Sequence, residues 1–361
     1  MSTFESKRFL IMTVDPVHVG TGGTRLGRVD NSIVREPGTR LPKIPGSALH
    51  GAIRQYAAYR YNKRTCAGQK GHCGKHTCPI CYTFGFVAGE NGVSAHSGVV
   101  SIGDAQILLF PVYSMAGPVW VTSPSALESF GINGQTVSPN QAKWKGITDQ
   151  NHLNLGWLMV EKEGELNLND KLAAVNQQIR DRVVLISDKL FSQVANSNLE
   201  VRTSVSINPE TGAAEEGALF TYEAIPRATI LWLEAIVDDY RGAFPAKNQL
   251  TEWNKILTST DDSKQKNLLK DWRLWQGKDS DDKLREAIQK AKEWVNEDLK
   301  RYDAETMPTP KEGWFKGKDI SQDSPTNVVA AGLEWAEQLG IGGMGTRGFG
   351  RVRSKVAEVA Q

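Results

Sequence analysis

The most informative stretch of this chain is residues 15–54, which read DPVHVGTGGTRLGRVDNSIVREPGTRLPKIPGSALHGAIR. An apolar run, Phe9–Val14, precedes it and predicts a buried strand, because the run is apolar and partly β-branched. A loop rich in glycine follows, with glycines at positions 20, 22, 23 and 27. Beyond PKIPG (42–46), the apolar residues from Ser47 to Tyr59 fall on one helical face, and Ser47 is suited to cap that helix. The sequence therefore predicts a strand and a helix joined by a long glycine-rich loop.

Basic residues surround a single acid in this loop. Asp30 lies among Arg25, Arg28, Arg35 and Arg40. Glycines let backbone amides approach a phosphate closely, and arginines and a helix N-terminus attract its charge. Residues 25–75 hold eleven Lys or Arg and two acids, although the net charge of the whole chain is only +2. We therefore expect a polyanion site here, with a solvated basic surface as the alternative.

Length and composition limit the class of protein. A chain of 361 residues can form one large domain or two smaller ones, and 40% hydrophobic residues are enough for a core. The N-terminal segment lacks the layout of a signal peptide. No run approaches the roughly 18 apolar residues that a membrane-spanning helix needs. We expect a cytoplasmic protein that does not associate with a membrane.

The cysteines form one cluster in the sequence. They are Cys66, Cys73, Cys78 and Cys81, with the spacing C-x6-C-x4-C-x2-C. In a reducing compartment this spacing favours a metal over disulfides, and zinc prefers a tetrahedron of such ligands. His72 or His76 could replace Cys66, and free or redox-active thiols are the alternative to a metal. We expect a structural zinc, since four protein ligands leave no open position for a reacting water.

The motif Gly340-x-Gly342-x-x-Gly345 imitates the dinucleotide fingerprint. That fingerprint needs a strand before it, a helix after it and an acid about twenty residues further on. Here a predicted helical face over 328–336 precedes the motif, and Gly340 is suited to end that helix. Only sixteen residues follow Gly345. The sequence therefore argues against nicotinamide binding.

Two later segments have their own character. Residues 200–208 and 218–237 are rich in strand formers and flank the turn signal PETG (209–212), which predicts an extended hairpin with an acidic tip. Residues 238–303 hold 28 charged residues among 66, together with four tryptophans. SDD (280–282) begins a predicted amphipathic helix in this segment. We expect an inserted helical lobe. The simpler interpretation of this lobe is a solvated helical addition that is packed by its tryptophans and has only a structural role.

Several motifs occur in an order that resembles the RAMP superfamily of CRISPR proteins. They are HVG (18–20), GRVDN (27–31), RE (35–36), IPGS (44–47), CPIC (78–81) with FG (84–85), IGDA (102–105) to FPV (110–112), EGALF (216–220) and GGMGTRGFG (342–350). Within the superfamily, the chain most resembles the repeated backbone subunit of the type III-B (Cmr) interference complex, over roughly residues 5–235 and 320–355. The backbone subunit of the type III-A (Csm) complex shares several motifs and is the nearest competitor.

The resemblance implies an α+β fold with a ferredoxin-like, RRM-type core. We expect residues 1–237 and 319–361 to form this core, with a zinc-binding loop at 66–81 and a thumb β-hairpin at about 200–225. The helical lobe would be inserted at 238–318. In such subunits the thumb reaches over the RNA path of a neighbouring subunit and opens the guide–target duplex at regular intervals.

The resemblance also implies the roles of single residues. Asp30 matches an aspartate that supports cleavage of target RNA with magnesium or another divalent cation, in which the RNA's own 2′-hydroxyl attacks the adjacent phosphate. Asp30 could instead cap a turn or pair with Arg28 or Arg35. His18 could act as acid or base, or be a packed loop histidine. The residues expected to contact guide RNA are Arg28, Arg35, Lys43, Ser47, Arg54, Gly343, Gly345, Thr346 and Arg347.

These expectations combine into one hypothesis. The chain is a guide-RNA-binding backbone subunit that assembles with further copies of itself in a helical filament and with other Cmr subunits, and it cleaves target RNA. One alternative is a scaffold of the same fold that holds RNA without cutting it. Another is a zinc-bearing RNA-binding protein outside CRISPR, which would be a monomer.

Overall fold

The computed structural model describes residues 4–22, 29–68, 71–87, 95–168, 171–277, 280–303 and 323–356. The chain packs as two compact units. The sheet unit comprises Lys7–Leu49, Ile102–Glu234 and Ala336–Gln361, and the helical unit comprises Met1–Ser6, His50–Ser101 and Ala235–Trp335. Both units are therefore assembled from segments far apart in the sequence.

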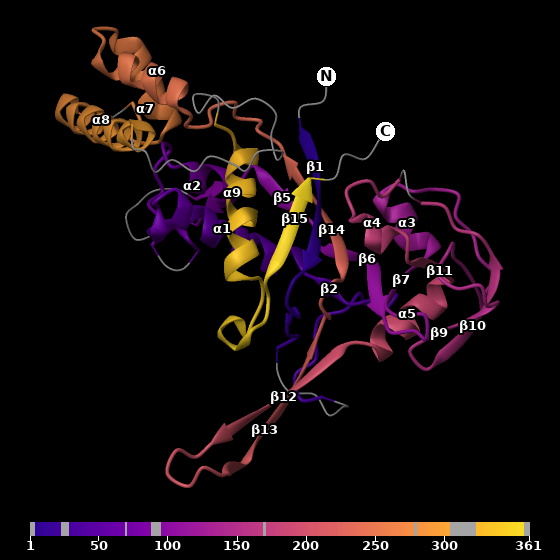
Figure 1. Ribbon diagram of the computed structural model, residues 1–361. Coiled ribbons are helices and arrows are strands. Elements are labelled where there is room, and N and C mark those ends of the chain that lie inside the picture. The colour runs from indigo at the N-terminus through magenta and orange to yellow at the C-terminus, as the bar shows by residue number, and fades with distance from the viewer. Residues whose placement is uncertain are drawn as a thin grey trace. The chain divides into compact units, whose positions relative to one another are not determined.

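An eleven-stranded sheet runs in the order β15-β1-β14-β6-β7-β11-β8-β10-β9, with β2 paired to β6 and β5 to β14 (Figure 1). Its strands are β1 (Glu5–Thr13), β2 (Lys43–Ile44), β5 (Val100–Ile102), β6 (Ala105–Val112), β7 (Val119–Thr122), β8 (Gln141–Lys143), β9 (His152–Leu155), β10 (Leu158–Gly164), β11 (Val183–Ile186), β14 (Ile230–Val237) and β15 (Val352–Val356). β1 and β15 are antiparallel, as are β6 and β14. The predicted strands at 9–14 and 99–112 are confirmed, and the fold is mixed α and β with a large sheet.

Apolar residues of the strands and of three short helices form the core of the sheet unit. The helices are α3 (Pro124–Phe130), α4 (Gln177–Arg180) and α5 (Asp188–Ser197). Ser123 caps α3 by accepting a hydrogen bond from the Ala126 amide, and Gly131, with φ 103°, ends the helix. Leu108, Leu185 and Leu127 are fully buried in this core. The core fixes the sheet that carries the loops described below.

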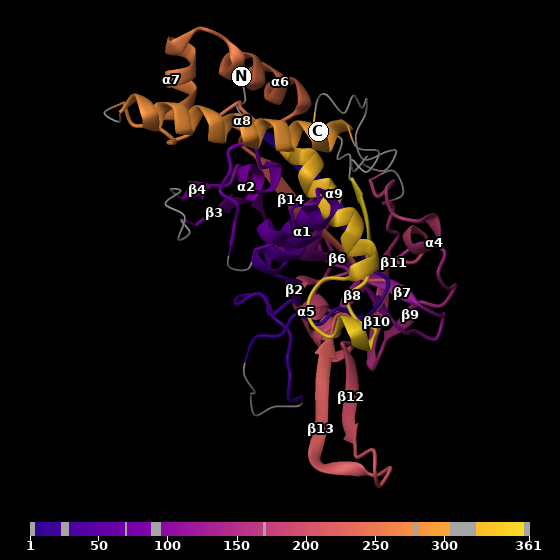
Figure 2. The ribbon, with the colours of Figure 1, turned by 90° about the vertical axis from the view of Figure 1, so that its left-hand side faces the viewer.

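The predicted hairpin is confirmed and projects from the sheet unit (Figures 1 and 2). β12 (Glu200–Ile207) pairs antiparallel with β13 (Ala214–Ala224), with Thr203 opposite Thr221. The strand-rich segment expected at 218–237 is divided, since β13 ends at Ala224 and β14 begins at Ile230. Ala228, with φ 63°, makes the turn between them.

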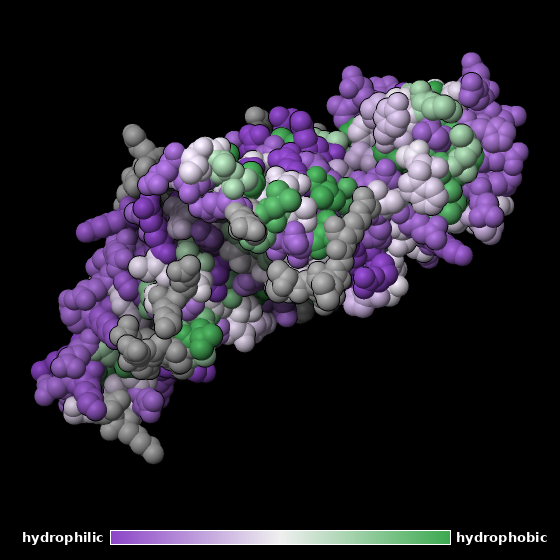
Figure 3. Space-filling view, turned by 90° about the horizontal axis from the view of Figure 1, so that it is seen from below, coloured by the Kyte–Doolittle hydropathy of each residue, from purple (hydrophilic) through white to green (hydrophobic). Residues whose placement is uncertain are grey.

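Hydrophilic side chains dominate the face of the molecule seen from below, where hydrophobic ones lie in small patches (Figure 3).

The helical unit contains most of α1, the short elements of residues 61–101 and the helices after residue 235. The elements are α1 (Gly46–Arg60), η1 (Arg64–Cys66), α2 (Pro79–Phe84), β3 (Gly85–Phe86), β4 (His96–Ser97), α6 (Lys247–Thr258), α7 (Asp262–Asp271), α8 (Asp281–Asp303) and α9 (Pro325–Leu339). α9 packs closely on α1, because a Cβ at Gly332 would lie 2.3 Å from the Ile53 carbonyl oxygen. The predicted helix before Gly340 is α9, and Gly340 follows it with φ 82°. A dinucleotide fingerprint needs a helix after its glycines, whereas α9 precedes them, so this motif is not such a fingerprint.

Helices α6, α7 and α8 lie together (Figure 2), and they share a hydrophobic core of their own. Trp253, Trp272, Trp275 and Trp294 lie in it, and the Trp272 ring centroid is 5.0 Å from that of Trp253. The predicted helix from residue 280 is confirmed as α8. The domain boundaries stay predictions, and residues 304–322 of the predicted lobe and core lie outside the described residues. Among the helices that the structure describes, none is long and apolar enough to cross a membrane.

Candidate functional site

Strand β13 and the residue that follows it hold both ends of the glycine-rich loop. At one end, Val17 and Ile225 exchange two backbone hydrogen bonds of 2.9 Å. At the other end, the Asn31 amide donates to the Thr221 carbonyl and the Glu223 amide donates to the Asn31 carbonyl, each at 3.0 Å. The base of the hairpin therefore supports residues 17–22 and 29–35, the described parts of this loop.

Asp30 is bound to Thr221 by three hydrogen bonds. Its Oδ2 accepts from the Thr221 amide at 2.8 Å and from the Thr221 hydroxyl at 2.7 Å. The Asp30 amide donates to the same hydroxyl oxygen at 2.9 Å. The backbone and then the side-chain bond from Thr221 lower the pKa of Asp30 below its usual 3.8. Asp30 is exposed, and no described residue donates to its Oδ1, so this oxygen can take a ligand.

His18 is packed beneath the loop. Its Nδ1 lies 2.6 Å from the Glu223 carbonyl oxygen, which can only accept, so Nδ1 carries the proton. The side chain is 8% exposed, and a Cβ at Gly20 would lie 3.1 Å from Nε2. A side chain at residue 20 would crowd Nε2, so glycine there keeps this ring nitrogen accessible to a proton.

Arg35 is engaged by protein partners. Its guanidinium donates to Glu223 Oε1 at 2.6 Å, to Asn196 Oδ1 at 2.7 Å and to the Ile33 carbonyl at 2.9 Å. Glu223 is 9% exposed, and its Oε2 also accepts from the Ile33 amide at 3.2 Å. Arg35 thus neutralises a buried carboxylate, and the alternative that Asp30 pairs with Arg35 finds no bond here. Arg28 lies outside the described residues.

The second glycine loop joins the same site. The Gly343 amide donates to the His18 carbonyl at 2.9 Å, and a Cβ at Gly342 would lie 2.4 Å from that oxygen. The 3-10 turn η3 (Gly345–Arg347) is exposed, and Arg347 donates to the Ser204 hydroxyl of β12 at 3.1 Å. The sheet unit therefore brings Asp30, His18 and the exposed loop 343–347 together at the root of the hairpin.

The helix start predicted to hold a phosphate already has a protein carboxylate. α1 begins at Gly46, one residue earlier than the predicted cap, because Asp104 accepts from the Gly46 amide at 2.6 Å. Ser47 lies exposed in the first turn. Asp104 also pairs with Lys43 at 2.5 Å and Glu36 does so at 2.9 Å, and these bonds raise the pKa of Lys43. A phosphate would have to compete with Asp104 for Lys43, whereas Ser47 is accessible.

Arg54 is placed differently from the other predicted RNA contacts. It belongs to the helical unit and is only 7% exposed. Its guanidinium donates to the Cys66 carbonyl at 2.9 Å and to the Phe84 carbonyl at 3.4 Å, and lies 2.9 Å from His72 Nδ1. These partners make Arg54 a support of the cysteine loop, and its burial argues against contact with RNA.

The four cysteines converge on one point. Their Sγ atoms all lie within 4.8 Å of one another, with separations of 3.6 Å for Cys66–Cys81 and 3.8 Å for Cys66–Cys78 and Cys73–Cys81. A zinc tetrahedron with bonds of about 2.3 Å requires sulfurs about 3.8 Å apart, whereas a disulfide needs about 2.05 Å. The cluster therefore has the dimensions of a four-thiolate zinc site. His72 is bound to Arg54, so Cys66 needs no histidine in its place.

The cysteine loop also contacts helix α8 and the tryptophan core. Lys75 pairs with Glu297 at 2.5 Å, and Lys63 pairs with the fully buried Asp298 at 2.6 Å. The His76 ring stacks on Trp272 with centroids 5.9 Å apart. Within the helical unit, the order of the loop and the position of α8 are therefore linked.

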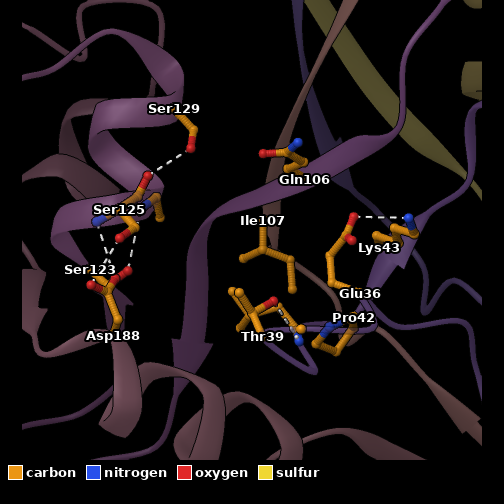
Figure 4. A pocket seen from close by; sticks show the side chains of 13 residues that line it. Glu36, Thr39, Pro42, Lys43, Gln106, Ile107, Ser123, Ser125, Ser129 and Asp188 are labelled. Carbon is orange, nitrogen blue, oxygen red and sulfur yellow. Dashed lines mark hydrogen bonds and ion pairs between the residues drawn. The ribbon is translucent and has the colours of Figure 1, made fainter.

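A pocket of about 320 Å³ in the sheet unit is distinct from the residues around Asp30 (Figure 4). Glu36 and Lys43 pair on one side, and Asp188 accepts hydrogen bonds from the Ser125 amide and hydroxyl on the other. The charged groups that line this pocket have partners in the protein. None of the predicted catalytic residues lines it.

Sequence comparison identifies relatives. Residues 10–353 of the chain match the family described as the RAMP superfamily. The chain is 30% identical over 254 residues to the CRISPR system Cmr endoribonuclease Cmr4 of Pyrococcus furiosus, across 62% of this chain and 78% of that protein. It is 38% identical over 80 residues to the CRISPR system Cms endoribonuclease Csm3 of Methanothermobacter thermautotrophicus, across 22% of this chain and 31% of that protein.

Solved structures share the fold. A crystal structure of Cmr4 superposes with a TM-score of 0.50 at 17% identity, covering 99% of this chain and 100% of the other. A chain of the type III-B Cmr-beta complex bound to cognate target RNA superposes with a TM-score of 0.50 at 18% identity, covering 64% of this chain and 84% of the other. At these identities the similarity establishes the architecture.

Proposed function

Because the chain belongs to the RAMP superfamily, we propose that it is a repeated, guide-RNA-binding backbone subunit of a type III-B CRISPR effector that cleaves target RNA. The match to Cmr4 extends over 254 residues, whereas the match to Csm3 extends over 80, which favours the type III-B assignment over type III-A. Its partners would be the guide RNA, the target RNA, further copies of the chain and other Cmr subunits. Base pairing to the guide would supply sequence specificity, with the protein contacting backbone and shape.

The strand order supports a ferredoxin-like core. Strands β1, β6, β14 and β15 occur in this order along the chain, with other elements between them. Helix α1 lies between β1 and β6 in the sequence, and α9 lies between β14 and β15. In the sheet they run β15-β1-β14-β6, so that the fourth strand is next to the first and the third lies between the first and the second. This is the arrangement of the β-α-β-β-α-β fold. The hairpin, the cysteine loop and α6–α8 are then additions to that core.

The observation that carries the enzyme assignment is the geometry of Asp30. Thr221 fixes one carboxylate oxygen of the exposed Asp30 and leaves the other without a donor among the described residues. Arg347, in the exposed turn 345–347, reaches Ser204 of the same hairpin and could hold the RNA backbone. The 2′-oxygen would attack phosphorus while the bond to the 5′-oxygen breaks, leaving a 2′,3′-cyclic phosphate and a 5′-hydroxyl. A divalent cation, when bound, would stabilise charge on the phosphate. Asp30 would orient the cation. The proton of the 2′-hydroxyl would pass to Nε2 of His18 or to water, and the leaving 5′-oxygen would take up a proton from water.

A structural zinc in the cysteine cluster is part of the proposal. The tetrahedral sulfur separations support it, and Cys66, Cys78 and Cys81 are buried thiols. Unpaired thiols suit the reducing cytoplasm in which we place the protein. Four sulfurs would complete the coordination, so the zinc would order residues 66–81 and take no part in cleavage.

Replacement of Asp30 tests the assignment against the non-cleaving scaffold. Complexes assembled with Asp30→Asn should bind guide and complementary target RNA like the wild type and lose cleavage by about a hundredfold or more. Asp149→Asn, an exposed aspartate in the same unit, is the matched control and should cleave normally. Full cleavage by Asp30→Asn would refute the catalytic assignment, and a monomer with no bound guide would favour an RNA-binding protein outside CRISPR.

A further inference from the structure

We infer that Thr221 and Glu223 of strand β13 are positioning residues for the cleavage site: the root of the hairpin sets the orientation of Asp30 and the place of His18. This inference rests on the proposed cleavage by Asp30. The sequence signals had pointed to the loop residues themselves, not to the strand that holds them. Thr221 and Glu223 are two positions apart, so their side chains project from the same face of β13.

Thr221 determines which oxygen of Asp30 is free. Both the amide and the hydroxyl of Thr221 donate to Oδ2, at 2.8 and 2.7 Å, so a single residue occupies that oxygen. The returning bond from the Asp30 amide to the Thr221 hydroxyl closes a ring between the two residues. An exposed aspartate would otherwise rotate about χ1 and χ2. Thr221 therefore holds Oδ1 in one direction, which is what a group orienting a cation or a phosphate requires.

Glu223 joins the other members of the site. Its carbonyl fixes the proton of His18 on Nδ1, and its carboxylate joins Arg35 to the Ile33 amide. The ion pair is largely buried, with side-chain exposures of 16% for Arg35 and 11% for Glu223. A buried carboxylate with this many bonds has little freedom to move. The segment 30–35 is thus attached to β13 through Thr221 at one end and Glu223 at the other.

Thr221→Val tests the first contact, because valine has the shape of threonine and lacks the hydroxyl. We expect cleavage at saturating target to fall about tenfold or more, since the lost bonds involve a charged group. The divalent-cation concentration for half-maximal rate should rise, while guide affinity and the thermal midpoint stay near wild type. Thr221→Ser should restore cleavage. Thr203→Val is the matched control, since Thr203 lies opposite Thr221 and has no bond to Asp30.

The outcomes separate this inference from the proposed function. If Asp30→Asn abolishes cleavage but Thr221→Val cleaves like the wild type, the positioning role is wrong and the function stands. If Asp30→Asn cleaves normally, the proposed function fails first. If Thr221→Ser is as slow as Thr221→Val, or guide binding falls in parallel with cleavage, Thr221 is merely structural. Glu223→Gln should lower cleavage with guide bound, and a wild-type rate would remove Glu223 from the inference.

Discussion

Replacing Cys78 with serine should remove the zinc and destabilise the helical unit. Cys78 is fully buried, and its Sγ lies 3.8 Å from that of Cys66. Serine leaves three thiolates and a harder oxygen, which a tetrahedral zinc site accepts poorly. Removing one partner of a buried charged site costs about 3–5 kcal/mol. At about 2–4 °C per kcal/mol, the thermal midpoint should fall by roughly 6–20 °C.

The loss should reach the tryptophan core. Lys75 of the loop pairs with Glu297, and His76 of the loop stacks on Trp272. A loop without metal would lose its order and with it both contacts. Structural zinc contributes about 10–16 kcal/mol in small metal-dependent folds, as much as the whole stability of about 5–15 kcal/mol of a typical domain. We therefore expect the fluorescence of the tryptophans to change when the metal is removed.

The assay combines elemental analysis with thermal unfolding followed by tryptophan fluorescence. Wild type should carry one zinc per chain, and a strong chelator should reproduce the effect of Cys78→Ser. Thr77→Val is the matched control, because Thr77 is buried beside Cys78 and its hydroxyl has no partner among the described residues. The reasoning is refuted if Cys78→Ser keeps its zinc, or if metal-free wild type unfolds at the same temperature as the loaded protein.

Three further predictions concern single residues. Arg54→Met should lower the free energy of unfolding by about 1–3 kcal/mol, since the Cys66 and Phe84 carbonyls lose a donor, and should leave the salt dependence of guide binding unchanged. Arg347→Ala should lower the slope of log affinity against log salt by about 0.7 for every guide sequence, and an unchanged slope would mean that Arg347 does not touch the backbone. Asp30 should titrate below 3.8 in a carboxyl-carbon NMR experiment, so its bonds to Thr221 persist at neutral pH and are lost only as pH falls through that lowered pKa; a midpoint at or above 3.8 would contradict this.

Local signals predicted the elements that depend on neighbouring residues. PETG (209–212) predicted the hairpin because turn residues act over a few positions, and the acids at 281–282 marked the start of α8. Gly340 ended α9 where it was expected. The convergence of the cysteines followed from their spacing. Each of these features is decided by contacts within about twenty residues.

The partners of the charged residues could not be predicted in the same way. Thr221 lies 191 residues from Asp30, and Glu223 lies 188 residues from Arg35. A count of charges cannot tell that Arg35 and Lys43 have carboxylates of their own, because Glu223 and Asp104 come from distant parts of the chain. Glu223 left one signal, since it is the one acid in the otherwise uncharged stretch LFTYEAI (219–225). Asp104 left another, in a motif that was noted for its resemblance alone.

The length of the hairpin and the position of Asp30 depend on different parts of the hairpin. The root of the hairpin, Thr221 to Ile225, bonds to Val17, Asp30 and Asn31, whereas the hydrogen bonds described at the turn 208–213 join residues of that turn to one another. Two residues added to each strand beyond the root would keep the alternation of faces and lengthen the arm by about 7 Å. One residue added inside 221–225 would turn Thr221 or Glu223 to the opposite face. Insertions at the tip could thus lengthen the arm without moving an atom around Asp30.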